Sequence, residues 1–235
     1  FYRSGALWLM LCLWLVIRYR LKTKQIFFWA GLPAVIGGLC LAVAFTGFIL
    51  ALEFTAVANA LFILAAAPFF TALLGRTFLG EQITRLTWAC MMVAAAGLAV
   101  MTGGELALGR GLGELFALMA ALGFSGLAVS LRTRQGTDML PAIFFGSLFA
   151  VLFAAVGIAL SDSGLIVTPI DLAYSSSMGL FQVGVGFLLF TVGAPHLLAV
   201  ELTLLSLTEI IAGPILVWIV IGEVPSLGAF AGGFL

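Results

Sequence analysis

Long apolar runs recur along the whole chain, and they constrain its fold more than any other feature. Each run is about 20 residues long, enough for an α-helix to cross a hydrocarbon layer of about 30 Å. Inside lipid every backbone polar group needs a partner within the chain, and a helix supplies these partners itself. With 63% hydrophobic and only 9% charged residues, and without alternating strand patterns, the sequence predicts an all-α polytopic membrane protein.

Nine membrane helices are expected, the last one truncated. They fall at residues 4–17, 28–51, 57–79, 86–102, 112–131, 139–161, 172–193, 199–221 and 227–235. Basic residues mark the cytoplasmic ends of such helices. Most of the basic residues lie in alternate connections, namely Arg18, Arg20, Lys22, Lys24, Arg76, Arg85, Arg132 and Arg134. We therefore expect these connections to face the cytoplasm.

An internal repeat organises the chain. Helix 57–79 is followed by Gly80-Glu81, and helix 199–221 by Gly222-Glu223, so that a shift of 142 residues carries 81 onto 223. The same shift superimposes the other helix boundaries and predicts ten helices in two repeats, 1–103 without its first helix and 104–235 with its last helix truncated. Since each half has an odd number of helices, the halves are expected to insert in opposite senses, which is an architecture of secondary transporters.

The residues around these motifs resemble a known family. Residues 60–74 read ALFILAAAPFFTALL before Gly80-Glu81, and residues 207–218 read LTEIIAGPILVW before Gly222-Glu223. Both halves resemble the EamA-type repeat of the drug/metabolite transporter (DMT) superfamily. The resemblance implies ten helices, a central cavity and export or exchange of small metabolites such as amino acids. The second half departs from the commoner pattern, because Ile210 follows Glu209 and the proline comes only at Pro214.

The predicted function is a secondary transporter that moves a small metabolite, an amino acid or drug-like solute, by alternating access. Its expected partners are a small-molecule substrate and the lipid bilayer, in the bacterial inner membrane by family resemblance. A net charge of zero argues against nucleic acid. Three widely spaced cysteines in apolar runs favour no metal, cofactor or redox role, and no enzymatic activity is expected. Substrate, transport direction, proton coupling and oligomeric state stay open.

Glu209 is the first candidate for substrate binding or coupling. It falls near the middle of helix 199–221, where a charged side chain costs about 3 kcal/mol and usually has a function. We expect its carboxyl group to bind a substrate ammonium or exchange a proton; hydrogen bonding to Ser206 is the structural alternative. Further polar or aromatic candidates for the cavity wall are Ser206, Thr203, Thr46, Gln182 and Trp218.

Four residues at helix ends or bends are expected to have structural roles. Glu81 and Glu223 close equivalent helices, where each carboxylate can accept hydrogen bonds from the backbone that starts the next helix. Pro68 and Pro214 lie inside predicted helices, where each can bend the helix or free backbone carbonyls toward a cavity.

Two other functions compete with transport. Gly123-Phe124-Ser125-Gly126 matches the Gly-x-Ser-Gly of rhomboid intramembrane proteases, and His196 is the sole histidine. A serine nucleophile needs its base within about 3 Å, whereas Ser125 and His196 are expected at different depths, with Ser125 bonded to a carbonyl one turn back. A lipid-flipping or scaffold subunit is the third option, since nothing in the sequence excludes an amphiphilic substrate.

Overall fold

The computed structural model describes residues 1–20, 23–102, 111–134, 137–160 and 167–209, together with Ala212 and Ile219. About 89% of these residues are helical, and they contain no β-strand. Five helical stretches are long and apolar enough to cross a membrane, namely Lys24–Phe54, Asn59–Leu79, Leu112–Arg132, Leu140–Leu160 and Pro169–His196. The prediction of an all-α polytopic membrane protein is confirmed.

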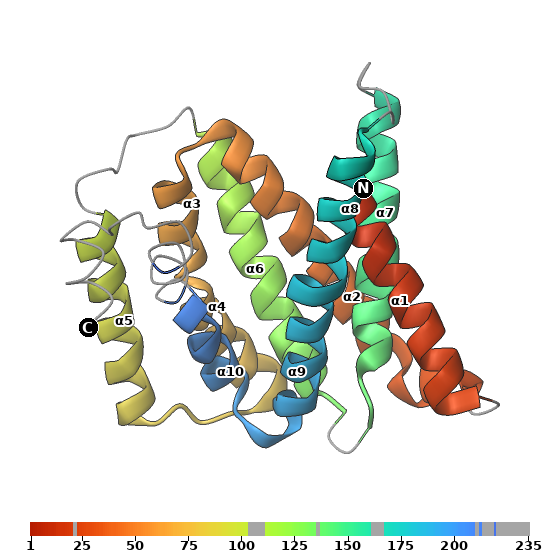
Figure 1. Ribbon diagram of the computed structural model, residues 1–235. Helices are drawn as coiled ribbons and strands as arrows, with labels where there is room; N and C mark the ends of the chain where they lie inside the picture. Colours follow the sequence, from red (N-terminus) through yellow and green to blue (C-terminus); the bar gives the residue numbers. More distant parts are fainter. Residues whose placement is uncertain are drawn as a thin grey trace.

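The helices stand side by side in one bundle (Figure 1). The first part of the chain forms α1 (Tyr2–Tyr19), α2 (Thr23–Phe54), α3 (Val57–Leu64), α4 (Ala67–Leu74), the π-helical turn η2 (Gly75–Leu79) and α5 (Arg85–Thr102). The second part forms α6 (Leu112–Arg132), α7 (Leu140–Leu160), α8 (Pro169–Ser177), η3 (Met178–Val185), α9 (Gly186–Gly193), η4 (Ala194–His196) and α10 (Ala199–Ser206). These bounds follow the predicted segments closely over the described residues.

The predicted helix 57–79 is interrupted before Pro68 in the structure. The Ala65 N–H still donates to the Leu61 carbonyl at 2.9 Å, but the Ala66 N–H donates to the Ile63 carbonyl, only three residues back, and Pro68 lies in the first turn of α4. Proline lacks a backbone N–H, which the first turn of a helix does not need and a helix interior does. Pro68 therefore interrupts the helical hydrogen bonding inside the spanning stretch Asn59–Leu79, as expected of a proline that bends a helix.

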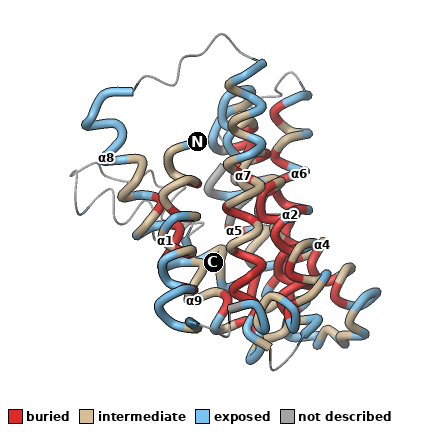
Figure 2. The backbone as a smooth tube through the Cα atoms, turned by 90° about the vertical axis from the view of Figure 1, so that its right-hand side faces the viewer, coloured by how far each residue is buried: buried red, intermediate tan, exposed pale blue. Residues whose placement is uncertain are grey.

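Small residues let the central helices approach closely. α2 packs along both α6 and α7, and α2 and α6 carry much of the buried surface in Figure 2. A Cβ on Gly38 would lie 2.5 Å from the Cβ of Phe145, and one on Gly123 would lie 2.6 Å from the Cys40 carbonyl oxygen. Close backbone approach at such residues is how helices associate in lipid, so the contact between α2, α6 and α7 is a tightly packed apolar seam.

One end of the bundle gathers the basic residues. The ends of α1, α6 and α9 and the starts of α5 and α10 lie together at the bottom of Figure 1. Arg18 lies in the last turn of α1, Arg85 starts α5 and Arg132 ends α6. We call this the basic end; it is the end that the sequence assigns to the cytoplasm.

The repeat seen in the sequence recurs in the helix boundaries. The shift of 142 residues carries α3, residues 57–64, onto 199–206, which are the bounds of α10. It also carries α1 onto the region of α7, and α2 onto α8 to η4. The helix contacts show the same correspondence. α7 packs against α2, and its counterpart α1 packs against α8 and η3, which correspond to α2. The division into two inverted halves at residue 103 stays a prediction.

Candidate functional site

A buried ion pair joins distant parts of the chain at the basic end. Oε1 of Glu81 accepts a hydrogen bond from Nε of Arg132 at 2.9 Å, and Oε2 accepts one from the backbone N–H of Ala199 at 3.1 Å. Nη1 of Arg132 donates in turn to the Pro195 carbonyl oxygen at 3.1 Å. The side chains of Glu81 and Arg132 are only 8% and 11% exposed. We call these four residues the Glu81 cluster.

Local backbone features explain why Glu81 reaches this position. Gly80 ends η2 with a left-handed φ of 67°, a conformation that glycine adopts without steric cost. Gly75 leaves room for the carboxylate, since a Cβ there would lie 3.1 Å from Oε2 of Glu81. Ala199 is the first residue of α10, so the carboxylate pairs with a backbone N–H that has no partner within the helix, at the positive end of the helix dipole.

The partners of Glu81 correct one prediction. The sequence pattern led us to expect hydrogen bonds to the helix that follows Glu81, which is α5, but the carboxylate caps α10, 118 residues further along the chain. Arg132 was expected only as a cytoplasmic charge. The signal available in the sequence was an acid and a base at helix ends assigned to the same membrane face, and this signal does not specify which pairs form.

The candidate site residues on α10 and just after it, Thr203, Ser206 and Glu209, differ in their surroundings. Glu209 is exposed and forms no hydrogen bond or ion pair with the described parts of the chain. Its side chain is therefore not buried among apolar side chains. The Ser206 hydroxyl donates to the Leu202 carbonyl at 3.0 Å and not to Glu209. Thr203 is 1% exposed and donates to the Val200 carbonyl at 2.9 Å. The two hydroxyls therefore bond within their own helix.

The remaining predicted site residues are spread over several elements. Thr46 is half-buried on α2, and Gln182 is exposed on η3. The structure does not bring them together with Glu209 in any described cavity. Trp218, Pro214 and Glu223 lie outside the described residues.

Ser125 is built into helix packing and not into a catalytic dyad. Its side chain is fully buried, and its hydroxyl lies 2.8 Å from the Ala121 carbonyl, one turn back, and 2.9 Å from the Ala67 carbonyl on α4. His196 is exposed at the basic end, with Nδ1 3.3 Å from the Val192 carbonyl. A serine hydroxyl shared between two carbonyls has no base to activate it, and nothing points to a rhomboid-type protease.

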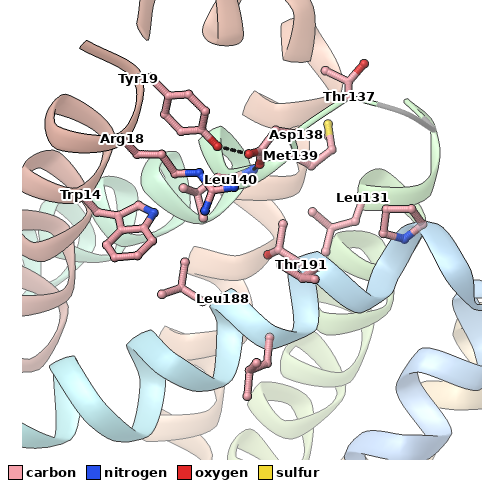
Figure 3. Close-up of a pocket in the computed structure, with 13 residues that line it drawn as sticks. Trp14, Arg18, Tyr19, Leu131, Thr137, Asp138, Met139, Leu140, Leu188 and Thr191 are labelled. Carbon is pink, nitrogen blue, oxygen red and sulfur yellow. Dashed lines mark hydrogen bonds between the residues drawn. The ribbon is translucent and has the colours of Figure 1, made fainter.

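A pocket opens at the basic end beside the Glu81 cluster. Its volume is about 250 Å³, and it lies between α1, the α6–α7 connection and α9, with Pro195 in its wall (Figure 3). Most of the lining is apolar, including Trp14, Leu131, Leu140 and Leu188. This is smaller than the cavities of about 300–1,000 Å³ that hold drug-sized ligands, so the pocket suits a small group or part of a larger molecule.

Three polar side chains give the pocket its charge pattern. The Tyr19 hydroxyl donates to Oδ2 of Asp138, and Oδ1 accepts from the Leu140 backbone N–H at 2.9 Å. Burial, and then the hydrogen bond to Asp138, raise the pKa of Tyr19 to about 12. The Arg18 guanidinium lies 5.4 Å from the Tyr19 ring centroid and 6.0 Å from that of Trp14, within cation–π range.

Aromatic rings connect α2, α6 and α9 nearer the middle of the bundle. Phe187 lies 5.4 Å from Phe45 and 5.8 Å from Phe190, and Phe190 lies 5.4 Å from Phe124. The Arg3 guanidinium lies over the Phe45 ring at 5.5 Å. This row of rings links helices from both halves of the chain.

One stretch of the chain matches a known protein family. Residues 1–103 match the model of the EamA-like transporter family. The EamA-type resemblance is confirmed. The family indicates a membrane transporter of the drug/metabolite type, as the sequence predicted.

Other comparisons bear on the fold alone. No curated protein sequence matches the chain. A solved structure titled "Crystal structure of protein" is similar with a TM-score of 0.76 at 20% sequence identity, over 98% of this chain and 83% of that one. At this identity the similarity shows only that the two chains share a fold.

Proposed function

We propose that this EamA-type chain is a secondary transporter that exports or exchanges a small metabolite by alternating access in the bacterial inner membrane. The match of residues 1–103 to the EamA-like transporter family is the observation that carries the proposal. The five apolar stretches of spanning length support a multi-pass protein. Amino acids and drug-like solutes are the proposed substrates, and residues 1–103 and 104–235 are the proposed repeats.

The repeat gives alternating access a physical basis. Rocking of two like halves exposes a midplane site first to one side and then to the other. The agreement of α3 with α10 under the 142-residue shift, and the exchange of contacts between α1, α2, α7 and η3, support two such halves.

The Glu81 cluster is the proposed closure at the basic end. Glu81 belongs to the first proposed repeat, whereas Arg132, Pro195 and Ala199 belong to the second. A few polar contacts hold this end together, and water can replace each of them when it opens. The apolar packing contacts between α2 and α6, in contrast, cannot be replaced by contacts with water. The cluster is thus suited to break and re-form in each cycle.

Glu209 stays the proposed coupling residue. A carboxylate in a predicted membrane-spanning helix is a functional candidate because placing a charge there is costly, and Glu209 has no hydrogen bond or ion pair to the described parts of the chain that would offset this cost. We expect Glu209→Gln to abolish coupled exchange or remove its pH dependence. Glu53→Gln, a change at an exposed acid outside the proposed site, serves as the matched control.

The test is transport by the purified protein in sealed vesicles. Uptake and counterflow are measured against a panel of amino acids, cationic drugs and sugar nucleotides, with a fluorescent phospholipid in parallel. Saturable exchange of at least one solute is the expected result. Movement of the lipid without any solute would favour the lipid-flipping alternative, and exchange unaffected by Glu209→Gln would remove this residue from the mechanism.

A further inference from the structure

The pocket of Figure 3 faces the bilayer as well as the basic end. Trp14 is 41% exposed, and two lining residues of α9, Leu189 and Val192, are 68% and 69% exposed. Both belong to the candidate membrane span Pro169–His196, so we expect their exposed side chains to face lipid. The pocket therefore has an apolar rim at the depth where a membrane helix meets the headgroup layer, marked by Trp14 and Tyr19.

The charges inside the pocket are not balanced equally. Both carboxylate oxygens of Asp138 accept hydrogen bonds from uncharged donors, the Tyr19 hydroxyl and the Leu140 N–H. Arg18, in contrast, forms no ion pair with any carboxylate of the described chain; it lies against the faces of two rings and stands beside the Tyr19 hydroxyl, whose pKa it acts to lower. A guanidinium has five N–H donors, and those not engaged with Tyr19 can bind an anion with parallel hydrogen bonds.

We propose that this pocket binds the phosphate of an acidic phospholipid from the leaflet at the basic end. Arg18 holds the phosphate, while the acyl chains lie along Leu189 and Val192. Arg20 lies just after α1 and Lys24 at the start of α2, at the same end of the bundle. Together with Arg18 they outweigh the single negative charge of Asp138. Basic pockets between membrane helices at this interface are suited to acidic headgroups.

The size and position of the pocket favour a lipid over a dissolved solute. A volume of about 250 Å³ accommodates a headgroup but not a whole phospholipid, and the exposed apolar rim provides a surface for the remaining chain. A water-soluble anion would leave that rim facing the bilayer and would gain nothing from it. This site is separate from the proposed transport site at Glu209, so its test does not depend on transport.

The experiment measures lipid binding to the purified, delipidated protein by native mass spectrometry, with phosphatidylglycerol and phosphatidylcholine as probes. We expect one phosphatidylglycerol to bind more tightly than phosphatidylcholine. Arg18→Gln removes the charge-assisted hydrogen bonds to the phosphate and should weaken phosphatidylglycerol binding about tenfold. Arg20→Gln removes a positive charge from the same end of α1 without changing the pocket lining, and should have a much smaller effect.

A second readout identifies the position of the bound lipid. Phosphatidylglycerol with brominated acyl chains should quench a saturable part of the tryptophan fluorescence, and Trp14→Phe should remove that part while circular dichroism stays unchanged. Equal affinity for the two lipids would overturn the proposal, as would equal effects of Arg18→Gln and Arg20→Gln. Binding of glycerol phosphate as tight as that of the lipid would also overturn it, in favour of a solute site.

Discussion

Breaking the Glu81–Arg132 pair should open the basic end of the protein. In Arg132→Gln, the Glu81 carboxylate keeps only the Ala199 N–H as a partner, and the Pro195 carbonyl loses its donor. Removing one member of a fully buried pair costs about 3–5 kcal/mol. Because the pair lies at an end that meets water, we expect a smaller cost of about 2 kcal/mol, which corresponds to roughly a 30-fold change in an equilibrium constant.

Cysteine labelling measures this opening. Val200 lies on α10, is 1% exposed, and packs in one cluster with Ala72 of α4 and Met91 of α5. In a protein whose three native cysteines are replaced by alanine, Val200→Cys should react slowly with a water-soluble maleimide. If the pair forms only in the closed state, adding Arg132→Gln should raise the labelling rate by roughly the same 30-fold factor.

The control and the refuting result are specific. Arg85→Gln removes another exposed base from the same end of the bundle and should leave the labelling rate unchanged. A double-mutant cycle with Glu81→Gln should show that the two substitutions are not additive, because both remove the same interaction. An unchanged rate in Arg132→Gln, or fully additive effects, would refute the closing role of the pair.

Three further predictions test the packing and the pocket. Gly38→Val should destabilise the protein by about 2 kcal/mol in detergent unfolding, because a Cβ there would lie 2.5 Å from that of Phe145. Gly5→Ala is its control, because a Cβ added at Gly5 would meet no atom of another helix within 4 Å. Ser125→Ala should cost about 1 kcal/mol in the same assay and leave transport intact, since its hydroxyl bonds only carbonyls. In an ultraviolet titration Tyr19 should ionise near pH 12; Asp138→Asn should lower this pKa but keep it above the ordinary 10.0, because burial is the larger cause. Since folding raises this pKa, its contribution to stability should be fully present below about pH 10 and lost as the pH rises toward 12.

The sequence predicted the helices well because their signal is local. Lipid requires long apolar helices, so hydropathy alone located segments such as Leu112–Arg132 and Leu140–Leu160. The interruption before Pro68 was expected from the chemistry of proline and not from hydropathy. Hydropathy stays high across Ala65 and Ala66, and only the backbone requirement of proline shows where one helix ends and the next begins.

The candidate site was harder to predict because its contacts are not local. Glu81 was identified by its position after a helix, but its partners lie 51 and 118 residues away. Hydroxyl groups such as that of Thr203 appeared free in the sequence, yet they bond carbonyls of their own helix, an option that every helix offers to serine and threonine. The depth of a carboxylate such as Glu209 along its helix can be read from a sequence, but the direction in which it points cannot.

Cross-linking the two sides of the proposed closure tests alternating access most directly. With Glu81→Cys and Arg132→Cys in an otherwise cysteine-free protein, a short reducible thiol cross-linker should hold the basic end shut. The account predicts that solute exchange in sealed vesicles stops on cross-linking and returns when the linker is reduced. Full exchange by the cross-linked protein would contradict it.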